Sequence, residues 1–493
     1  MHKNTQLKFS PEDSDYLVAN GLTPELADAQ VNLLKSGPRH VRLDRTASIG
    51  DGILSFNAVE KNDLARKFEI RSKDKKVSKF VPASGAATRM FGDVWDFYRN
   101  GRENSHTQKF FANIRKFVFF QDLEKYVNYG NDKRVFTKFL LTDAGLNYGN
   151  LPKALLKFYK HNEVSYTPFE MHLYESIDYL NSGDNTMDIH FSINPDFEKE
   201  YKRLAWKTCA NIEDKYGIRL NVHLAPQGRS TQTVALDEMG KIVRDSNGNM
   251  LLRPGGHGSL LKNVQDLDAD ILFIRNVDNV MPPKHNTLNV FYEKVLGGFL
   301  VKITDTLHSI LDRLEKDDQT AIQEAILFTE TFLNTQIPTA VRMSNSCQEI
   351  YNVLNRPVRV NGVIKNTGEP GGGAFWIKDK KGNQSLQIIE SSQVSKEEDQ
   401  LNIFARGSYF NPVDMVCCTR NHKGERFNFD DYADKTQSII TEKTYNSKRI
   451  TVLEHPGLWN GGMANWHSVF VELPVKSFNP VKSVLDLLRL TTK

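Results

Sequence analysis

The sequence predicts an α/β fold, with a mixed, mostly parallel central sheet flanked by helices. Apolar segments typical of strands alternate with segments of helical spacing through the middle of the chain, and this alternation favours a parallel sheet. Residues 187–193 and 219–224 are predicted strands, with a predicted helix at 197–216 between them. Residues 271–276 form a further apolar strand. The chain has 493 residues, which is enough to bury a large core.

The first part of the chain is predicted to be helical, over residues 10–70. Ser10 and Thr23 each precede a proline and an acidic residue, which is the pattern of a capped helix N-terminus. We therefore expect an N-terminal helical extension at residues 1–74 and an α/β domain at residues 75–493.

The predicted α/β domain contains two helical insertions, near residues 92–150 and 284–350. Beyond residue 356 the sequence returns to Gly-rich, strand-like segments, and a short amphipathic helix is expected around 481–490. An apolar stripe at helical spacing in the second insertion is expected to face the core. Its members are Leu300, Ile303, Leu307, Ile310, Leu311 and Leu314.

The composition is that of an ordinary soluble globular protein, 39% hydrophobic and 25% charged. The formal net charge of +4 is too small to indicate nucleic acid or an anionic membrane as the partner. Four cysteines lack the spacing of a disulfide framework or a zinc site, so we expect free thiols and a cytoplasmic protein. No stretch is apolar enough to predict a membrane helix. The lysines near the first buried strand are expected to be solvated: Lys73, Lys75, Lys76 and Lys79.

Residues 80–90, FVPASGAATRM, are the most informative segment of the chain. A buried strand followed by small residues and then a basic one lets backbone N–H groups approach a phosphate. The segment therefore indicates a phosphate-binding loop, although a tight structural turn has the same pattern. The expected nucleotide-binding residues are Ser84, Gly85, Ala86, Ala87 and Thr88, and the basic Arg89 follows them.

Three later segments carry groups suited to related chemistry. Residues 253–260 contain a Pro-Gly-Gly-His-Gly turn, whose glycines indicate close backbone approach to a flat or anionic group, or a plain Gly-rich loop. Asp278 follows an apolar strand, where a carboxylate is a suitable Mg²⁺ ligand or part of a turn that closes the strand. Glu390 ends another strand, and its carboxylate can accept two hydrogen bonds from sugar hydroxyls.

Taken in order, these segments and residues 471–488 resemble the motifs of UDP-glucose-type pyrophosphorylases, members of the nucleotide-diphospho-sugar transferase superfamily with a GT-A-like fold. The resemblance extends over roughly residues 77–490, with large unmatched insertions. Residues 368–373, 410–414 and 457–461 also resemble an uncharacterised bacterial family of about this length, of the DUF4301 type.

The resemblance implies roles for individual residues. Arg89, Lys153 and Lys482 would be the catalytic cations around the phosphates, and Mg²⁺ would be held by Asp278 and Asp414. At Ala87 the family usually has a glycine, and the additional Cβ would shift the nucleotide or adapt the loop to a smaller group. Further nucleotide contacts would come from Gln232, Gly255, Gly256 and His257, and sugar contacts from Gly371, Gly372, Glu390, Asn411 and Trp459, although a buried core Trp is an equal alternative for Trp459.

The implied activity is that of a sugar-1-phosphate nucleotidyltransferase. It would form a nucleotide sugar and pyrophosphate from a nucleoside triphosphate, UTP by resemblance, and a sugar 1-phosphate. One alternative is a GT-A-like glycosyltransferase, which would have no use for a triphosphate cradle. Another is a non-catalytic nucleotide or sugar sensor, which the alanine at position 87 keeps open. The sequence leaves open the sugar, the base and the oligomeric state.

Overall fold

The computed structural model describes residues 9–128, 132–161, 163–180, 185–281, 286–368, 371–379 and 382–490. The chain forms two compact units, each assembled from separate stretches of sequence. Unit 1 comprises Met1–Asn57, Gln227–Asp268 and Leu300–Glu472, and unit 2 comprises Ala58–Pro226, Ala269–Phe299 and Leu473–Lys493. The expected division at residues 74 and 75 stays a prediction.

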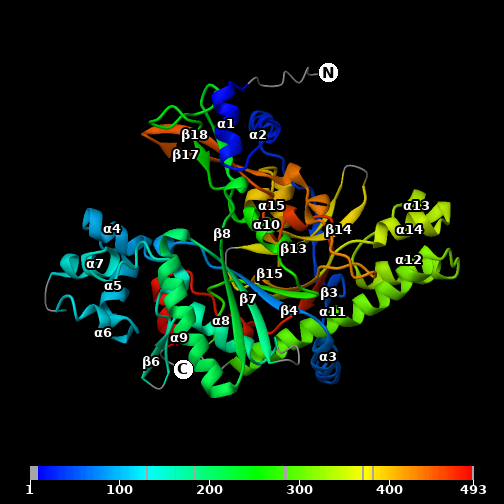
Figure 1. Cartoon of the computed structure of the whole chain (residues 1–493), viewed down its shortest axis with the longest axis horizontal. Helices are drawn as coiled ribbons and strands as arrows, with labels where there is room; N and C mark the ends of the chain where they lie inside the picture. The colour runs from blue at the N-terminus through cyan, green and yellow to red at the C-terminus, as the bar shows by residue number, and fades with distance from the viewer. Residues whose placement is uncertain are drawn as a thin grey trace. The chain divides into compact units, whose positions relative to one another are not determined.

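Unit 2 contains parallel strands in the order β11 (Ile271–Arg275), β4 (Val77–Pro82), β7 (Thr186–Ile193) and β8 (Arg219–Pro226). The helix α9 (Glu198–Tyr216) connects β7 to β8 and packs along β8 (Figure 1). These elements confirm the strands and the helix predicted from the alternation of apolar segments. Because the strands are parallel, the residues that follow β4 and β11 emerge at the same edge of the sheet.

The lysine predicted to be solvated in β4 is buried instead, so that expectation is wrong for Lys79, whose exposed fraction is 0%. The strand is central, and its first five residues are all buried. A charged side chain in such a strand needs a partner, and Glu175 of α8 (Pro168–Ser176) forms an ion pair with Lys79.

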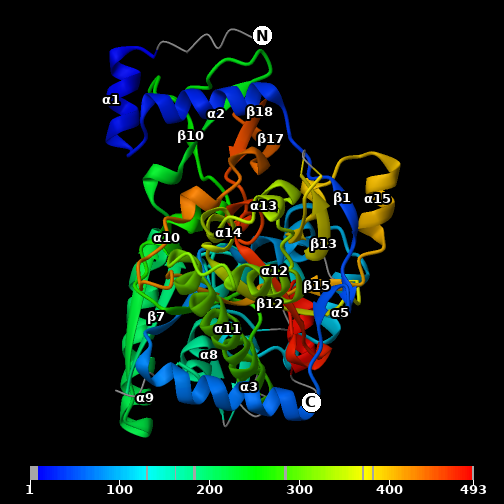
Figure 2. The same cartoon turned by 90° about the vertical axis from the view of Figure 1, so that its right-hand side faces the viewer.

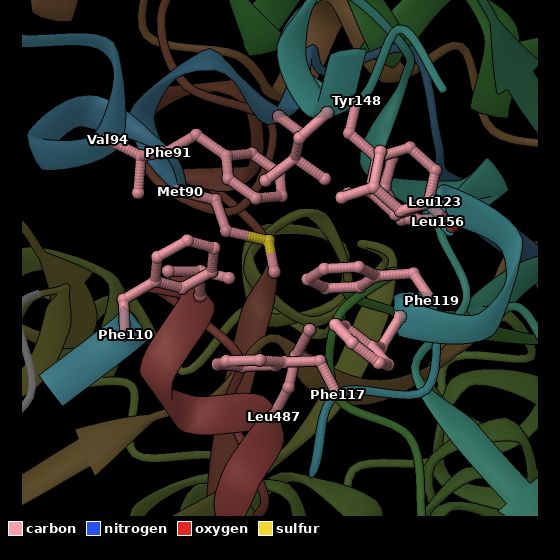
Figure 3. Close-up of a cluster of buried hydrophobic side chains, with 14 of the residues drawn as sticks. Met90, Phe91, Val94, Phe110, Phe117, Phe119, Leu123, Tyr148, Leu156 and Leu487 are labelled. Atoms are coloured by element: carbon pink, nitrogen blue, oxygen red, sulfur yellow. The ribbon is translucent and has the colours of Figure 1, made fainter. Parts of the chain in front are cut away.

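The predicted insertion at 92–150 is helical, as expected. It contains α4 (Gly92–Asn100), α5 (Ser105–Ala112), α6 (Phe120–Leu123) and α7 (Lys133–Leu141). Asn104 caps α5 through a capping box with Thr107, and Asp132 caps α7. The helices surround a cluster of buried aromatic and aliphatic side chains (Figure 3). Met90 from the predicted phosphate loop and Leu487 from the C-terminal segment join this cluster.

Unit 1 begins with α1 (Pro11–Ala19) and α2 (Pro24–Ser36), which Ser10 and Thr23 cap as predicted. In Figure 2, α2 extends across an antiparallel sheet, and it contacts β9 and β18. The strand order in this sheet is β10 (Leu252–Arg253), β9 (Thr233–Asp237), β18 (Lys448–Glu454) and β17 (Ile439–Tyr445).

A second set of strands in unit 1 surrounds β12 (Val358–Lys365). This strand pairs in antiparallel fashion with β15 (Tyr409–Asn411) and β16 (Asp414–Cys418) and in parallel with β19 (His467–Glu472). Next to β15, β13 (Gly372–Lys378) pairs with β14 (Gln384–Ile389) and β1 (Leu43–Thr46). The fold is therefore mixed α/β with flanking helices, as predicted, and the antiparallel pairs concentrate in unit 1.

The expected helix over residues 10–70 is wrong in its middle part. Residues 43–54 are not helical but contain β1, β2 (Ser48–Ile49) and β3 (Gly52–Leu54), and α3 (Ala58–Arg71) follows them. Short strands form there because β1 and β3 gain backbone partners on β13 and β19, which are distant in sequence. A short helix is present at the C-terminal end, as expected, and it is the 3₁₀ helix η14 (Val484–Leu490).

The long apolar stripe predicted near residue 300 lies on α11 (Asn286–Glu315), and α12 (Ala321–Phe332) follows. All six stripe residues are buried. The remaining helices are α10 (Leu260–Gln265), α13 (Thr339–Ser344), α14 (Cys347–Leu354) and α15 (Glu398–Ala405). Across the described ranges, no helix has both the length and the apolar character that crossing a membrane would require.

Candidate functional site

The predicted phosphate loop follows β4 and runs into η2 (Ala87–Arg89). Its backbone pairs with the segment around Pro152: the Ala87 N–H donates to Leu151 O at 3.0 Å, and the Lys153 N–H donates to Gly85 O at 3.0 Å. The two ends of the helical insertion are therefore paired through their backbones, and this pairing brings Lys153 beside the loop.

The loop presents its small residues to solvent. Gly85 and Ala86 are exposed, and within the described part of the chain their N–H groups have no hydrogen-bond partner. A Cβ on Gly85 would meet no atom within 4 Å. Thr88 is tied down, because its Oγ1 donates to Gly149 O at 3.2 Å, and Arg89 is exposed. Two backbone donors and one guanidinium are therefore accessible to an anion.

Ala87 is fully buried and belongs to the hydrophobic cluster of the insertion. Its methyl group thus lies on the inner side of the loop, and its N–H is already bonded to Leu151. Ser84 is half-buried.

Asp278 lies just beyond β11 and is shared by two lysines. Its Oδ2 accepts a hydrogen bond from Lys153 Nζ at 2.9 Å and another from Lys482 Nζ at 3.1 Å. The side chains are 4% exposed for Asp278, 17% for Lys153 and 40% for Lys482. Burial opposes ionisation of this carboxyl, but the two ammonium groups outweigh it and hold the pKa of Asp278 below its usual value.

The C-terminal segment delivers Lys482 to this cluster through several backbone ties. Lys153 Nζ also donates to Val481 O at 2.7 Å. The Val484 N–H donates to Met90 O at 3.1 Å, so the segment is fixed directly after Arg89. The residues predicted to be cations around the phosphates, Arg89, Lys153 and Lys482, all lie in unit 2 with Asp278.

The cluster offers limited metal ligation by the protein itself. In the parts of the chain that the structure describes, no three His, Cys, Asp or Glu side chains are grouped so that they could hold a metal ion. Asp278 Oδ1, however, is buried and has no hydrogen-bond partner among the described residues. A carboxylate oxygen left in this state suits a hard cation that takes its other ligands from phosphates and water. Asp414, the other predicted ligand, is buried at the start of β16 in unit 1.

In unit 1, three predicted site residues from distant segments meet. The His257 ring stacks on Trp459 with centroids 4.4 Å apart, and Trp459 Nε1 donates to Glu390 Oε1 at 3.0 Å. The Leu458 N–H donates to His257 Nδ1 at 3.3 Å. Burial lowers the pKa of His257, although Glu390 and Glu454 act in the opposite direction. The imidazole is therefore neutral near pH 7.

The glycines of the Pro-Gly-Gly-His-Gly turn are required by packing inside unit 1. A Cβ on Gly255 would lie 2.4 Å from both His455 and Thr231 O, and one on Gly256 would lie 2.7 Å from Glu454. His455 Nε2 also lies 2.8 Å from Thr231 O. These contacts explain the glycines without a ligand, so the plain Gly-rich loop accounts for the pattern.

The other predicted residues of unit 1 are dispersed around this cluster. Gly371 lines a cavity of about 270 Å³ together with aromatic rings that include Phe375 and Phe410. Gly372 packs on Ile388, because a Cβ there would lie 2.4 Å from its Cγ2. Residues 369 and 370 of the predicted Gly-rich motif lie outside the described residues.

Asn411 and Gln232 form hydrogen bonds with other segments of unit 1. The Asn411 amide donates to Gly362 O at 2.8 Å, and its Oδ1 accepts from the Val413 N–H at 3.0 Å, where φ is +59°. Gln232 O accepts a hydrogen bond from Gln30 at 3.3 Å.

Sequence reasoning missed several buried polar residues near these sites. Arg359 is fully buried and donates to Trp459 O, Ser468 Oγ and Gln387 Oε1. Arg275 is equally buried and pairs with Glu175. Arg275 and Lys79 are each the only charged residue of their strand, and Arg359 stands between two valines at the start of β12. A cation inside such a segment is the signal that points to a buried network.

Several solved structures are similar to this chain at low identity. A UDP-N-acetylglucosamine pyrophosphorylase from Trypanosoma brucei, in complex with an inhibitor, has 12% identity and a TM-score of 0.49, over 99% of this chain and 82% of that chain. A mutant UDP-glucose pyrophosphorylase from Leishmania major has 12% identity and a TM-score of 0.46, over 99% and 79%. An inositol-1-phosphate CTP transferase from T. maritima has 9% identity and a TM-score of 0.30, over 85% and 97%.

A search of curated proteins gave no match. A family model described as "Domain of unknown function (DUF4301)" matches residues 10–493, and this chain therefore belongs to that family.

Proposed function

We propose that this protein is a sugar-1-phosphate nucleotidyltransferase that forms a nucleotide sugar and pyrophosphate. The observation that carries the proposal is the cluster of Lys153, Lys482 and Asp278 beside the loop that contains Gly85 and Arg89. The loop has the phosphate-binding pattern, and the two lysines come from segments more than three hundred residues apart. Such convergence of cations suits a substrate with several phosphates.

The chemistry requires little covalent work from the protein. An oxygen of the sugar 1-phosphate attacks the α-phosphorus of the triphosphate, the bond to the β-phosphate bridging oxygen breaks, and pyrophosphate leaves. The reacting phosphates repel one another, so the protein must hold them together and neutralise their charge. The N–H groups of Gly85 and Ala86 would orient the phosphates, while Arg89, Lys153 and Lys482 would neutralise them.

The residues present fit a magnesium ion at Asp278, in the sense that its Oδ1 is available as one hard ligand. When bound, Mg²⁺ would neutralise phosphate charge and complete its coordination with phosphate and water oxygens. UTP is the proposed triphosphate, because the motifs resemble those of UDP-glucose-type enzymes.

For sugar recognition we propose Glu390 and Trp459 of unit 1. Glu390 is anchored by the indole N–H at 3.0 Å, and a carboxylate has further acceptor sites for a hydroxyl donor. The Trp459 ring is held by its stacking on His257, so it can serve as a rigid apolar platform for a sugar face.

Two observations rank the alternatives. The paired lysines of unit 2 favour a triphosphate substrate over the finished nucleotide sugar of a glycosyltransferase. Ala87, which kept a non-catalytic sensor open, has its methyl group in the hydrophobic cluster. The alanine at this position therefore takes no space from an anion on the exposed side of the loop, and it gives no support to the sensor.

The test is an assay of pyrophosphate release with a panel of nucleoside triphosphates and sugar 1-phosphates in the presence of Mg²⁺. Wild-type protein should release pyrophosphate with at least one pair. Arg89→Ala and Lys153→Ala should each weaken triphosphate binding by about 1.5–3 kcal/mol, the value of a charged hydrogen bond. Lys207→Ala, on the exposed surface of α9, serves as the control.

Other results would support a different function. Sugar transfer from a nucleotide sugar without pyrophosphate release would indicate a glycosyltransferase. Triphosphate binding without turnover on any sugar 1-phosphate would indicate a sensor. Unchanged triphosphate affinity in both Arg89→Ala and Lys153→Ala would contradict the phosphate cradle itself.

A further inference from the structure

A fully buried ionic network lies in unit 2 beneath the loop that carries Asp278. Its centre is Glu175 on α8, whose Oε1 accepts hydrogen bonds from Lys79 Nζ on β4 and from Arg275 Nη1 on β11, the latter at 2.8 Å. His172, one turn earlier on α8, places its Nδ1 3.2 Å from the same oxygen. Arg275 also pairs with Glu293 at 3.0 Å. The exposed fraction of each of the five side chains is 1% or less.

The network is electrically balanced when His172 is neutral, because two cations face two carboxylates. Burial lowers the pKa of His172 to about 4 and that of Lys79 to about 8, while Arg275 and Lys79 keep the pKa of Glu175 low against the effect of burial. Removing charges from water costs several kcal/mol per ion, and apolar side chains of similar volume often stabilise a core equally well. Stability alone therefore does not explain the network.

The network holds the backbone on both sides of Asp278. His172 Nε2 lies 3.2 Å from Val277 O, the carbonyl just before Asp278, and Arg275 Nη2 donates to Asn279 O, just after it, at 3.4 Å. Both facing oxygens only accept, and a neutral imidazole has one N–H, so His172 donates either to Glu175 from Nδ1 or to Val277 O from Nε2. Glu175 Oε1 already accepts from Lys79 and Arg275, which favours the proton on Nε2. The Val277 carbonyl belongs to the peptide plane directly before Asp278, and the Asn279 carbonyl belongs to the plane that follows Asn279. Holding these two planes restricts the backbone between them, and with it the direction of the Asp278 Cα–Cβ bond.

We infer that His172 and Arg275, held in place by Glu175 and Lys79, are positioning residues that orient the Asp278 carboxylate toward the metal and the phosphates. This inference rests on the proposed function, because it assigns the network a purpose at the same site. The positioning acts through the backbone of residues 277–279, and no member of the network needs to touch the substrate. Arg275 is fixed by ion pairs with Glu175 and Glu293, and Lys79 Nζ donates to His172 O at 3.3 Å, which holds the helix turn that carries His172. The buried charges are retained because donors anchored in this way hold a loop more rigidly than apolar packing does.

The experiment compares two substitutions of His172. His172→Leu keeps apolar volume and removes the donor to Val277, whereas His172→Gln keeps an N–H donor at a similar reach. We measure the Mg²⁺ concentration for half-maximal triphosphate binding by titration calorimetry, with UTP as the probe. His172→Leu should raise this concentration about tenfold, the effect of one lost buried hydrogen bond, and His172→Gln should restore most of it.

His467 of unit 1 provides the matched control. It is also fully buried, and its Nε2 lies 3.0 Å from Leu354 O and its Nδ1 3.1 Å from Thr335 Oγ1. His467→Leu should lower the melting temperature as His172→Leu does, but it should leave the Mg²⁺ dependence unchanged. A shift of the Mg²⁺ dependence in both leucine variants would assign the effect to general loss of stability and overturn the inference.

A second readout separates this inference from the proposed function. Amide hydrogen exchange at residues 277–280 should speed up in His172→Leu and not in His172→Gln, whether or not any ligand binds. If wild-type protein binds no triphosphate, the proposed function fails and the exchange result still decides the positioning role. If wild type binds UTP with Mg²⁺ and folded His172→Leu matches it in both readouts, the positioning role is wrong and the proposed function stands.

Discussion

At the scale of single residues, the two carboxylate oxygens of Asp278 differ in their hydrogen bonding. Its Oδ2 is saturated by Lys153 and Lys482, while its buried Oδ1 has no hydrogen-bond partner among the described residues. The three side chains together carry one positive charge. Mg²⁺ alone would meet two ammonium groups there, and free triphosphate alone would meet a carboxylate. Metal and nucleotide should therefore bind together more tightly than either does by itself.

Asp278→Asn tests this charge balance. The change removes the negative charge and keeps the shape, so free triphosphate should bind without metal roughly tenfold more tightly, about 1.4 kcal/mol. Mg²⁺ should no longer enhance binding, and turnover should be lost. The measurement is UTP titration with and without EDTA. Weaker binding in EDTA, with the metal enhancement intact, would show that Asp278 is not the metal ligand.

Lys482 is the more exposed of the two lysines and comes from the C-terminal segment. Such a lysine can leave Asp278 for charge that grows on the α-phosphate during reaction, so Lys482→Ala should lower turnover more than substrate affinity. Lys482→Arg should rescue poorly, because a planar fork does not replace a compact ammonium group. Steady-state kinetics of both variants check this, and turnover near that of wild type in Lys482→Ala would exclude the catalytic role.

At the scale of elements, the site of unit 2 depends on loops held by distant backbone partners. The phosphate loop pairs with residues 151–153, and the C-terminal segment is tied to Met90. Beside the sheet, α3 and α11 approach so closely that a Cβ on Gly298 would lie 1.8 Å from Leu64 O. Backbone atoms cannot rotate away as a side chain can, so this contact depends on glycine.

Gly298→Ala should therefore destabilise unit 2 by at least ~1–3 kcal/mol, the range for overpacked cores. Gly92→Ala is the control, because a Cβ on Gly92 at the start of α4 meets nothing within 4 Å. It should leave stability unchanged or raise it by up to about 1 kcal/mol, since alanine is the better helix former. Urea unfolding of both variants measures the difference. Equal stabilities would mean that the two helices separate at little cost.

At the scale of the whole molecule, both units contain neutral histidines: His172 and His467 are fully buried, and His190 is half-buried. Burial lowers the pKa of His172 and of His190 to about 4, and that of His467 to about 3. His190 also stacks on His223, with ring centroids 4.3 Å apart. In the unfolded chain the same groups titrate near their ordinary value of 6.5. The unfolded state therefore takes up protons at a higher pH than the folded state does.

Because these folded-state pKa values are depressed, stability is fully present above pH ~6.5 and is lost as the pH falls toward 4. Each histidine contributes a slope of up to ~1.4 kcal/mol per pH unit in that window. Urea midpoints measured at intervals between pH 7.5 and 4.5 should fall, and His467→Gln should flatten the decline. A midpoint that stays constant to pH 5 would show that these histidines are accessible to protons in the folded state.

Local sequence patterns predicted much of this protein correctly. The elements β7, α9, β8 and β11 and the apolar stripe of α11 lie where the spacing of apolar residues predicted them. Such predictions succeed because hydrophobic periodicity and helix capping depend on residues close together in sequence. Some residues that the motifs singled out do lie together: Lys153 and Lys482 both contact Asp278, and His257 and Glu390 both contact Trp459. Their roles in binding stay predictions.

Only the tertiary structure decided which polar groups are buried and which glycines serve packing. Lys79 looks like a surface lysine until Glu175 is placed beside it, and Gly255 looks like a ligand-binding glycine until His455 and Thr231 fill the space at its Cα. The strands of residues 43–54 likewise depend on partners on β13 and β19. In each case the contact that determines the structure joins groups far apart in sequence. Local periodicity does not predict which distant groups the fold brings together.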